Sequence, residues 1–268
     1  MTSARYADHL RKRFPDLAPV VDDLFLLEAH QIANLPQRAP RDLLGIVLLS
    51  RPDLVRFLVT RYPPIESFVT TLIDDTGSDD ADFVAAAEEL AWEIADYIVY
   101  QRAPEMYDAK AETSWGRDAL VELEPLDQKV VLDGGAGTGF VTFAVAPIVA
   151  TVFAVEPVGT LRGYMKEKAR GEGLSNVYVI DGTLSSIPLP DNSVDALITQ
   201  RAIGWDLGRE LNEIERIVKP GGAALHLLGD SYPAADHATY HQALLEGGYE
   251  QLAYRDGETL CRKYLKRV

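Results

Sequence analysis

Cysteine is almost absent from this chain of 268 residues, which contains only Cys261. A single cysteine cannot form an intramolecular disulfide, so a fold held together by disulfides within the chain is excluded. Cys261 lies in an expected strand, which is typical of a half-buried packing residue. Long apolar runs are also missing. The most apolar stretch, residues 43–59, is interrupted by Arg51, Asp53 and Arg56, and it is too short and too charged to span a bilayer.

Positive charge is scarce as well. Lys and Arg number 26 against 41 Asp and Glu, which gives a formal net charge of -15. An acidic chain repels phosphate backbones, so we expect no nucleic-acid partner. Residues 1–13 are charged and have no apolar centre, unlike a secretory signal. We therefore expect a cytoplasmic protein that is not bound to a membrane.

The hydrophobic pattern changes near residue 105. Before this point apolar residues recur at helical spacing, which predicts helices over residues 16–33, 41–49, 52–61 and 82–100 and an acidic loop over 74–82. After it, β-rich segments alternate with helical ones. The expected strands are residues 129–133, 151–156, 177–180, 194–199, 223–228, 249–254 and 259–265. We expect a helical domain over residues 1–105 and an α/β domain over 106–268.

Strands that alternate with helices form a parallel sheet with helices on both faces. The last two expected strands are joined only by residues 255–258, and so short a link permits only an antiparallel hairpin. The pattern therefore predicts a doubly wound, seven-stranded, mostly parallel sheet with one antiparallel strand, preceded by an all-helical domain.

Residues 130–139 read Val-Val-Leu-Asp-Gly-Gly-Ala-Gly-Thr-Gly and are the most informative segment. They indicate a buried strand that ends in a carboxylate, followed by a tight turn whose backbone can approach a ligand closely. The dinucleotide fingerprint G-x-G-x-x-G does not fit, because its last position is Phe140 when counted from Gly135 and Thr142 when counted from Gly137. A pyrophosphate would also meet the charge of Asp133, whereas a cationic ligand would be attracted to it.

The segment resembles motif I, D-x-G-x-G-x-G, of the class I S-adenosylmethionine (SAM)-dependent methyltransferases, with Asp133, Gly135, Gly137 and Gly139 in the matching positions. Residues 181–195 are similar to the GDAxxLPFPDxSFD segment of the small-molecule, UbiE-like (type 11) enzymes, and residues 213–222 to their LxExxRVLKPGG segment. The expected sheet is also the arrangement of this family. The resemblance covers residues 107–268 and does not reach the helical half.

The resemblance implies a SAM site at the carboxyl ends of the strands. Glu156 would accept hydrogen bonds from both ribose hydroxyls, although the same carboxylate could instead serve the start of the next helix. Thr183 replaces the Asp that contacts adenine in the family and Leu184 replaces an Ala, so backbone contacts are favoured there. The Thr183 hydroxyl and Asp181 are the alternative side-chain partners. The expected cofactor residues are Asp133, Gly134, Gly135, Gly137, Thr138, Gly139, Glu156, Pro157, Thr183, Leu184, Gln200 and Arg201.

The acceptor pocket is expected to involve side chains before the first strand and after the fourth. These are Tyr107, Trp115, Ile203 and Trp205. Methyl transfer requires alignment more than a fixed catalytic group, so no catalytic residue is assigned. We expect no metal. His226 reads as a hydrogen-bonded core residue, and His237 and His241 are four residues apart but have no evident third ligand.

We therefore predict a SAM-dependent methyltransferase that methylates a small molecule and releases S-adenosylhomocysteine. The helices over residues 41–61 have too much apolar surface to stand free. They would cover the ligand face of the sheet as a lid, or else be buried in a homodimer. The alternatives are a non-catalytic SAM-binding or interaction protein that works through its helical half, and a nucleotide-dependent oxidoreductase, which the failed fingerprint disfavours.

Overall fold

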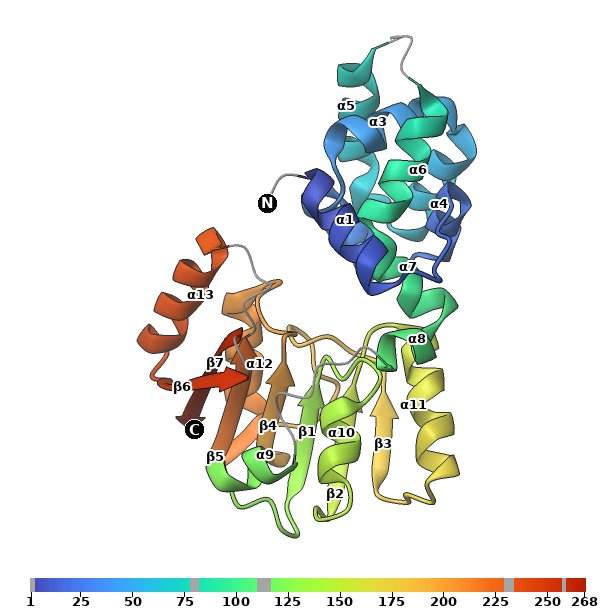
Figure 1. Cartoon of the computed structure of the whole chain (residues 1–268). Coiled ribbons are helices and arrows are strands. Elements are labelled where there is room, and N and C mark those ends of the chain that lie inside the picture. The colour runs from blue at the N-terminus through green and yellow to red at the C-terminus, as the bar shows by residue number, and fades with distance from the viewer. Residues whose placement is uncertain (1–2, 78–81, 110–116, 229–233, 257–258) are drawn as a thin grey trace. The chain divides into compact units, whose positions relative to one another are not determined.

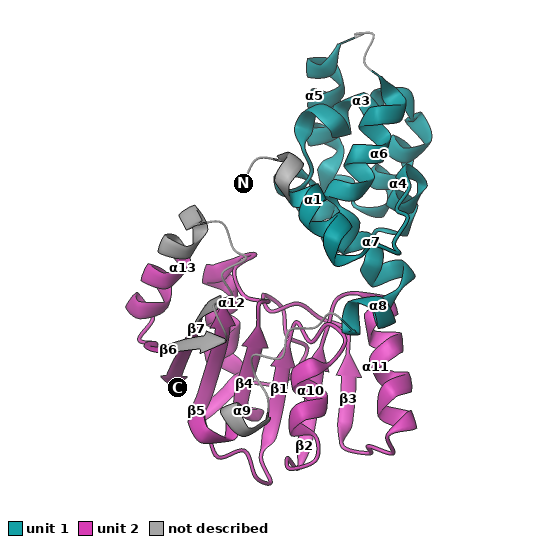
Figure 2. Ribbon diagram, viewed as in Figure 1, with its two compact units in different colours: residues 1–110 teal, residues 111–268 magenta. Residues whose placement is uncertain are grey.

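The computed structural model describes residues 3–77, 82–109, 117–228, 234–256 and 259–268. The chain divides into two compact units, residues 1–110 and 111–268 (Figure 2). This division lies close to the point near residue 105 where the hydrophobic pattern changes. Each unit is described by itself below.

The described part of the first unit is built from helices (Figure 1). The expected helices over residues 41–49 and 52–61 are confirmed. The elements are α1 Ser3–Arg13, the 3-10 helix η1 Val21–Leu26, α2 Ala29–Arg38, α3 Arg41–Ser50, α4 Pro52–Arg61, the 3-10 helix η2 Pro63–Ile65, α5 Glu66–Thr76, α6 Phe83–Glu93, α7 Ala95–Arg102 and α8 Pro104–Asp108.

The apolar faces of α3 and α4 are buried inside the first unit itself. Leu44 and Leu48 of α3 and Leu54 and Leu58 of α4 belong to one core with residues from α1, α2, α5, α6 and α7. Our expectation that this surface needs the sheet domain or a second copy to cover it was therefore wrong. The helices of the first unit bury these apolar side chains against one another.

Three expectations for the helical half need correction. The helix expected over residues 16–33 is two elements, because Leu27 is extended and the Glu28 N–H donates to the side chain of Gln31, which starts α2. The helix expected over 82–100 is interrupted at the buried Ile94, which has φ -109° and ψ 17°. Residues 74–76, expected in a loop, form the last turn of α5.

The second unit consists of a seven-stranded sheet and its helices (Figure 1). Its elements are α9 Arg117–Leu123, β1 Val130–Gly134, α10 Phe140–Val145, β2 Thr151–Val155, α11 Gly159–Gly171, β3 Val177–Ile180, β4 Val194–Gln200, α12 Leu207–Ile217, β5 Val218–Leu228, α13 Ala234–Glu246, β6 Glu250–Asp256 and β7 Thr259–Arg267. The helix α8 ends at Asp108, and Ala109 lies in a turn.

The sheet order is β3-β2-β1-β4-β5-β7-β6. All pairs from β3 to β5 are parallel, whereas β7 runs antiparallel to both of its neighbours, β5 and β6. The expected fold class, with its single antiparallel strand, is confirmed. Successive strand residues face opposite sides: Val131 packs with Val141 and Val145 of α10, whereas Leu132 belongs to the core that includes Ile214 and Ile217 of α12.

A chain of buried polar groups crosses the sheet core. The Thr199 hydroxyl lies 2.8 Å from Nδ1 of His226, and Nε2 of the same ring lies 3.1 Å from the Tyr249 hydroxyl. Burial lowers the pKa of His226 to about 3, so the ring is neutral at physiological pH. The expectation of a hydrogen-bonded core histidine is confirmed.

Candidate functional site

The strand order brings three loops to one edge of the sheet. Gly134, the last residue of β1, pairs with Val155 at the end of β2 and with Thr199 near the end of β4. The segments that follow these strands therefore start side by side. In open α/β sheets this edge, at the carboxyl ends of the strands, is where ligands bind.

The loop after β1 needs its glycines for two physical reasons. Gly135, Gly137 and Gly139 have φ values of 67°, 58° and 87°, in the left-handed region that other residues avoid. A Cβ atom at Gly135 would lie 2.4 Å from the Cβ of Ala202, which follows β4. The amides of Gly135 and Ala136 both donate to the carbonyl of Val155, so the loop turns toward β2.

Asp133 joins the tip of β1 to α10. Its Oδ2 accepts hydrogen bonds from the amide of Thr142 at 2.9 Å and from the Thr142 hydroxyl at 2.6 Å. The carboxyl is 2% exposed, and this burial raises its pKa to about 6, against the lowering effect of the two Thr142 bonds. No local pattern in the sequence marks Thr142 as the partner of Asp133.

Glu156 joins the glycine loop to the start of α11. Oε2 accepts from the amide of Gly137 and Oε1 from the amide of Val158, both at 2.9 Å. Burial raises the Glu156 pKa to about 7, because it outweighs these two bonds. The structural role that the sequence left open, at the start of the next helix, is thus present. Each carboxylate oxygen can accept a further hydrogen bond, so a ribose diol can still be accommodated.

The segment after β3 forms a tight turn. The Ser186 amide donates to the carbonyl of Thr183, and the Thr183 hydroxyl lies 3.2 Å from that of Ser185. Leu184 is buried against Gly134, where an added Cβ would lie 2.5 Å from Leu184 Cδ2. Asp181 is exposed and forms an ion pair with Arg162 of α11.

The segment after β4 is held by an acid that the sequence analysis missed. Glu210 of α12, which is 2% exposed, accepts from the amides of Gly204, Trp205 and Asp206 at 2.6, 3.1 and 3.2 Å. Arg201 has a left-handed φ of 57°, and its amide donates to the carbonyl of Leu227. A carboxylate in the first turn of a helix is a general capping signal, and it could have pointed to Glu210.

The remaining expected site residues differ in how exposed they are and in the unit to which they belong. Thr138 and Ile203 are buried, whereas Trp205 is 57% exposed. Tyr107 belongs to the first unit, where its ring packs edge-on against Tyr100 with centroids 4.7 Å apart. Trp115 lies outside the described residues.

The described residues show no group of three His, Cys, Asp or Glu side chains that could hold a metal ion. His241 Nδ1 lies 2.8 Å from the Tyr264 hydroxyl, and the side chain of His237 is outside the described set. Within the same residues, no helix has the length and apolarity needed to cross a membrane.

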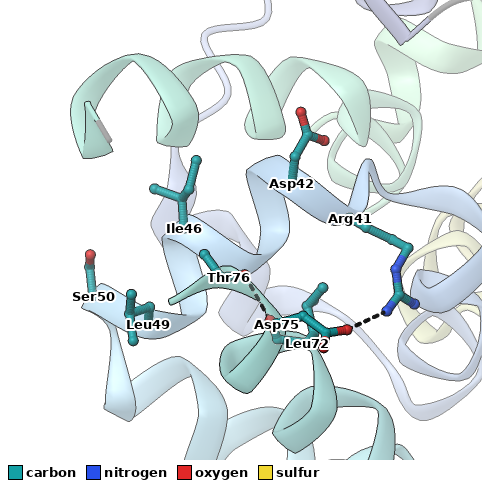
Figure 3. Close-up of a pocket in the computed structure, with 8 residues that line it drawn as sticks. All are labelled: Arg41, Asp42, Ile46, Leu49, Ser50, Leu72, Asp75 and Thr76. Carbon is teal, nitrogen blue, oxygen red and sulfur yellow. Dashed lines mark hydrogen bonds and ion pairs between the residues drawn. The ribbon is translucent and has the colours of Figure 1, made fainter. Parts of the chain in front are cut away.

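A pocket of about 360 Å³ lies in the first unit, beside α3 and the end of α5 (Figure 3). Arg41 pairs with Asp75 across its rim at 3.7 Å. The two helices approach closely here. A Cβ atom at Gly45 would lie 2.0 Å from the Thr76 hydroxyl, so the approach depends on glycine at this position. The lining residues are Arg41, Asp42, Ile46, Leu49, Ser50, Leu72, Asp75 and Thr76. No motif in the sequence marks this pocket.

Residues 132–226, which run from within β1 to within β5, match the family model described as a methyltransferase domain. The second unit contains a methyltransferase domain. The match includes the glycine loop, Glu156 and the turn after β3, and it leaves the helical first unit outside. The expected family is therefore confirmed for this part of the chain.

Two named relatives are similar to about half of this chain. Malonyl-[acyl-carrier protein] O-methyltransferase of Yersinia pestis is 35% identical over 132 residues, which cover 47% of this chain and 47% of that protein. Demethylmenaquinone methyltransferase of Geobacillus stearothermophilus is 28% identical over 137 residues, which cover 48% of this chain and 57% of that protein. The chain thus spans about half the length of the curated relatives it matches.

Among solved structures, a SAM dependent methyltransferase from Aquifex aeolicus is similar, with a TM-score of 0.52 and 21% identity. The similarity covers 60% of this chain and 96% of that one. It shows that the methyltransferase domain has the same fold as that protein.

The buried Asp133 predicts a pH-dependent stability of the methyltransferase domain. Its pKa rises from 3.8 to about 6 on folding, so the folded state holds the proton more tightly than the unfolded state. The resulting contribution to the free energy of unfolding is fully present below pH 3.8 and is lost as the pH rises through 6. This loss is about 3 kcal/mol by pH 8. Asp133→Asn keeps an acceptor oxygen for Thr142 and does not titrate. We expect urea unfolding to show Asp133→Asn gaining stability relative to the unchanged protein between pH 4 and 8.

Thr142→Val is the matched control, because it removes one donor to Asp133 at nearly constant volume. It should raise the Asp133 pKa further and move the stability loss to higher pH. A stability difference between Asp133→Asn and the unchanged protein that stays constant from pH 4 to 8 would contradict the assignment.

Proposed function

We propose that this protein is a SAM-dependent methyltransferase that methylates a small-molecule acceptor and releases S-adenosylhomocysteine. The observation that carries the proposal is the pair of buried carboxylates, Asp133 and Glu156, beside the glycine loop of the methyltransferase domain. Burial outweighs hydrogen bonding at both, as their raised pKa values indicate. A ligand that brings positive charge and hydroxyl donors would stabilise both. SAM has an ammonium, a sulfonium and a ribose diol, and it has no phosphate.

Each group of residues at the strand tips would contact a different part of SAM. Glu156 would accept the ribose hydroxyls, and the backbone of Thr183 and Leu184 would meet the adenine ring. Gly135 to Gly139 would allow close approach of the loop, with Gly134 and Pro157 beside it. Gln200 and Arg201 would face the methionine end. The bound cofactor supplies an electrophilic methyl group on sulfur. The chain itself has to orient the acceptor and exclude water, so we assign no catalytic residue.

We further propose that the first unit supplies the acceptor pocket and that Tyr107 and Trp115 contribute to it. Two observations support this division. The family match lies wholly within residues 132–226. The two named relatives are each similar to about half of this chain, and their names state different acceptors, a malonyl-[acyl-carrier protein] and demethylmenaquinone. We propose a cytoplasmic protein that acts on neither nucleic acid nor membranes and that could form a homodimer.

The choice of cofactor can be tested directly. Because the loop departs from the dinucleotide spacing and Asp133 favours a cation, S-adenosylhomocysteine and SAM should bind, and NAD should bind far more weakly. Isothermal titration calorimetry with each ligand measures this. Tighter binding of NAD than of S-adenosylhomocysteine would refute the proposed function.

Glu156 provides the second test. Glu156→Ala removes the acceptor for the ribose hydroxyls, so the free energy of S-adenosylhomocysteine binding should weaken by about 1–3 kcal/mol. Glu156→Gln keeps one acceptor oxygen and should fall between Ala and the unchanged protein. The exposed Glu167 of α11 offers a control, Glu167→Ala, which should bind normally. Unchanged affinity in Glu156→Ala, or an unfolded variant, would leave Glu156 with its structural role alone.

The role of the first unit requires a different experiment. A chain that begins at Met106 should keep affinity for S-adenosylhomocysteine, because the residues expected to bind it lie between Asp133 and Arg201. The same chain should lose methylation of the full protein's acceptor, measured by transfer of labelled methyl groups. Methylation at an undiminished rate would show that the helices do not form the acceptor pocket.

A further inference from the structure

Arg162 of α11 occupies a junction between two strand tips. Its Nη1 donates to the carbonyl oxygens of Glu156 and Pro157 at 2.8 and 2.7 Å, and to Oδ1 of Asp181 at 3.0 Å. Glu156 and Pro157 directly follow β2, and Asp181 directly follows β3. Because β2 and β3 are parallel neighbours, one guanidinium nitrogen ties together the two segments that leave them.

The burial of the two partners is unequal. The Arg162 side chain is 17% exposed, whereas that of Asp181 is 71% exposed. A largely buried guanidinium that holds two backbone carbonyls has a fixed position. It therefore orients the exposed carboxylate of Asp181, and not the reverse. Its positive charge also acts on the nearby Glu156 carboxyl, where it lowers the pKa against the larger effect of burial.

The turn after β3 is closed by contacts of its own. The Ser186 amide donates to the carbonyl of Thr183, and the Thr183 hydroxyl lies 3.2 Å from that of Ser185. These contacts lie within the turn and do not give it a polar contact to the β2 tip. Arg162 supplies one through Asp181, two residues before Thr183.

We propose that Arg162 is a positioning residue for the nucleoside half of the cofactor, an inference that rests on the proposed function. Arg162 does not touch the cofactor. It fixes the backbone of Glu156, whose carboxylate would bind the ribose, relative to the turn of Thr183 and Leu184, whose backbone would meet the base. The ion pair with Asp181 completes this connection between the β2 and β3 tips.

Calorimetry with two ligands tests the proposal in the full-length protein. S-adenosylhomocysteine contains the nucleoside and the amino-acid part, whereas 5′-methylthioadenosine contains the nucleoside alone. Arg162→Leu removes all three bonds and should weaken both ligands by a similar factor, about tenfold. Arg170→Leu, at an exposed position of the same helix, is the matched control and should bind both ligands normally.

Asp181→Asn offers a second variant at an exposed position, where the fold is not at risk. It breaks the ion pair but leaves the two backbone carbonyls bound to Arg162, so both ligands should weaken by a smaller factor, about threefold. Because the two side chains act through one contact, the double variant should bind no more weakly than Arg162→Leu alone.

The outcomes separate the two proposals. If the unchanged protein does not bind S-adenosylhomocysteine, the proposed function fails and the role of Arg162 fails with it. If the unchanged protein binds but Arg162→Leu and Asp181→Asn bind equally well, only the positioning role is overturned. A loss that is much larger for S-adenosylhomocysteine than for 5′-methylthioadenosine also overturns it, because the damage would then lie at the amino-acid end.

Discussion

Two carboxylates buried at neighbouring strand tips constrain the methyltransferase domain. Asp133 ends β1 and holds Thr142 of α10, and Glu156 follows β2 and holds Gly137 and Val158. Both are needed to fix the glycine loop between its strand and the helices around it. Both also carry a desolvation cost, since burial raises their pKa values to about 6 and about 7. The loop is thus held in place by groups that a cationic, hydroxyl-bearing ligand would stabilise, which couples the local fold to binding.

The sheet could be predicted from the sequence because its signals are local. Buried parallel strands give short runs of β-branched residues, and the glycines at 135, 137 and 139 each meet a backbone requirement of the turn itself. The start of β5 was predicted less well. It begins at Val218, ahead of the expected residue 223, because Val218 pairs with Val194 before a register shift. Pro220 and Gly221 read as a turn, and only the neighbouring strand shows that pairing begins before them.

The partners of the site residues could not be predicted, because they are set by packing between distant segments. Glu210 and Arg162 look like ordinary helix-surface charges in the sequence, yet each holds backbone groups of a strand tip. The first unit shows the same limit. Asp96 accepts from the Tyr6 hydroxyl and from Arg38, both at 3.0 Å, and Arg38 stacks 4.0 Å from the Tyr6 ring. Apolar periodicity locates such helices, but it contains no information on the polar contacts that join them.

The acidic groups at the strand tips differ in how strongly they can act on a ligand. Asp133 and Glu156 are buried, so solvent screens their charges poorly. Asp181 supplies a carboxylate nearby, but Arg162 neutralises it and it is largely solvated. The two buried acids would then act most strongly on a ligand bound at this edge. A cofactor with an ammonium and a sulfonium matches this arrangement better than one with a pyrophosphate, whose charges would add to those of Asp133 and Glu156.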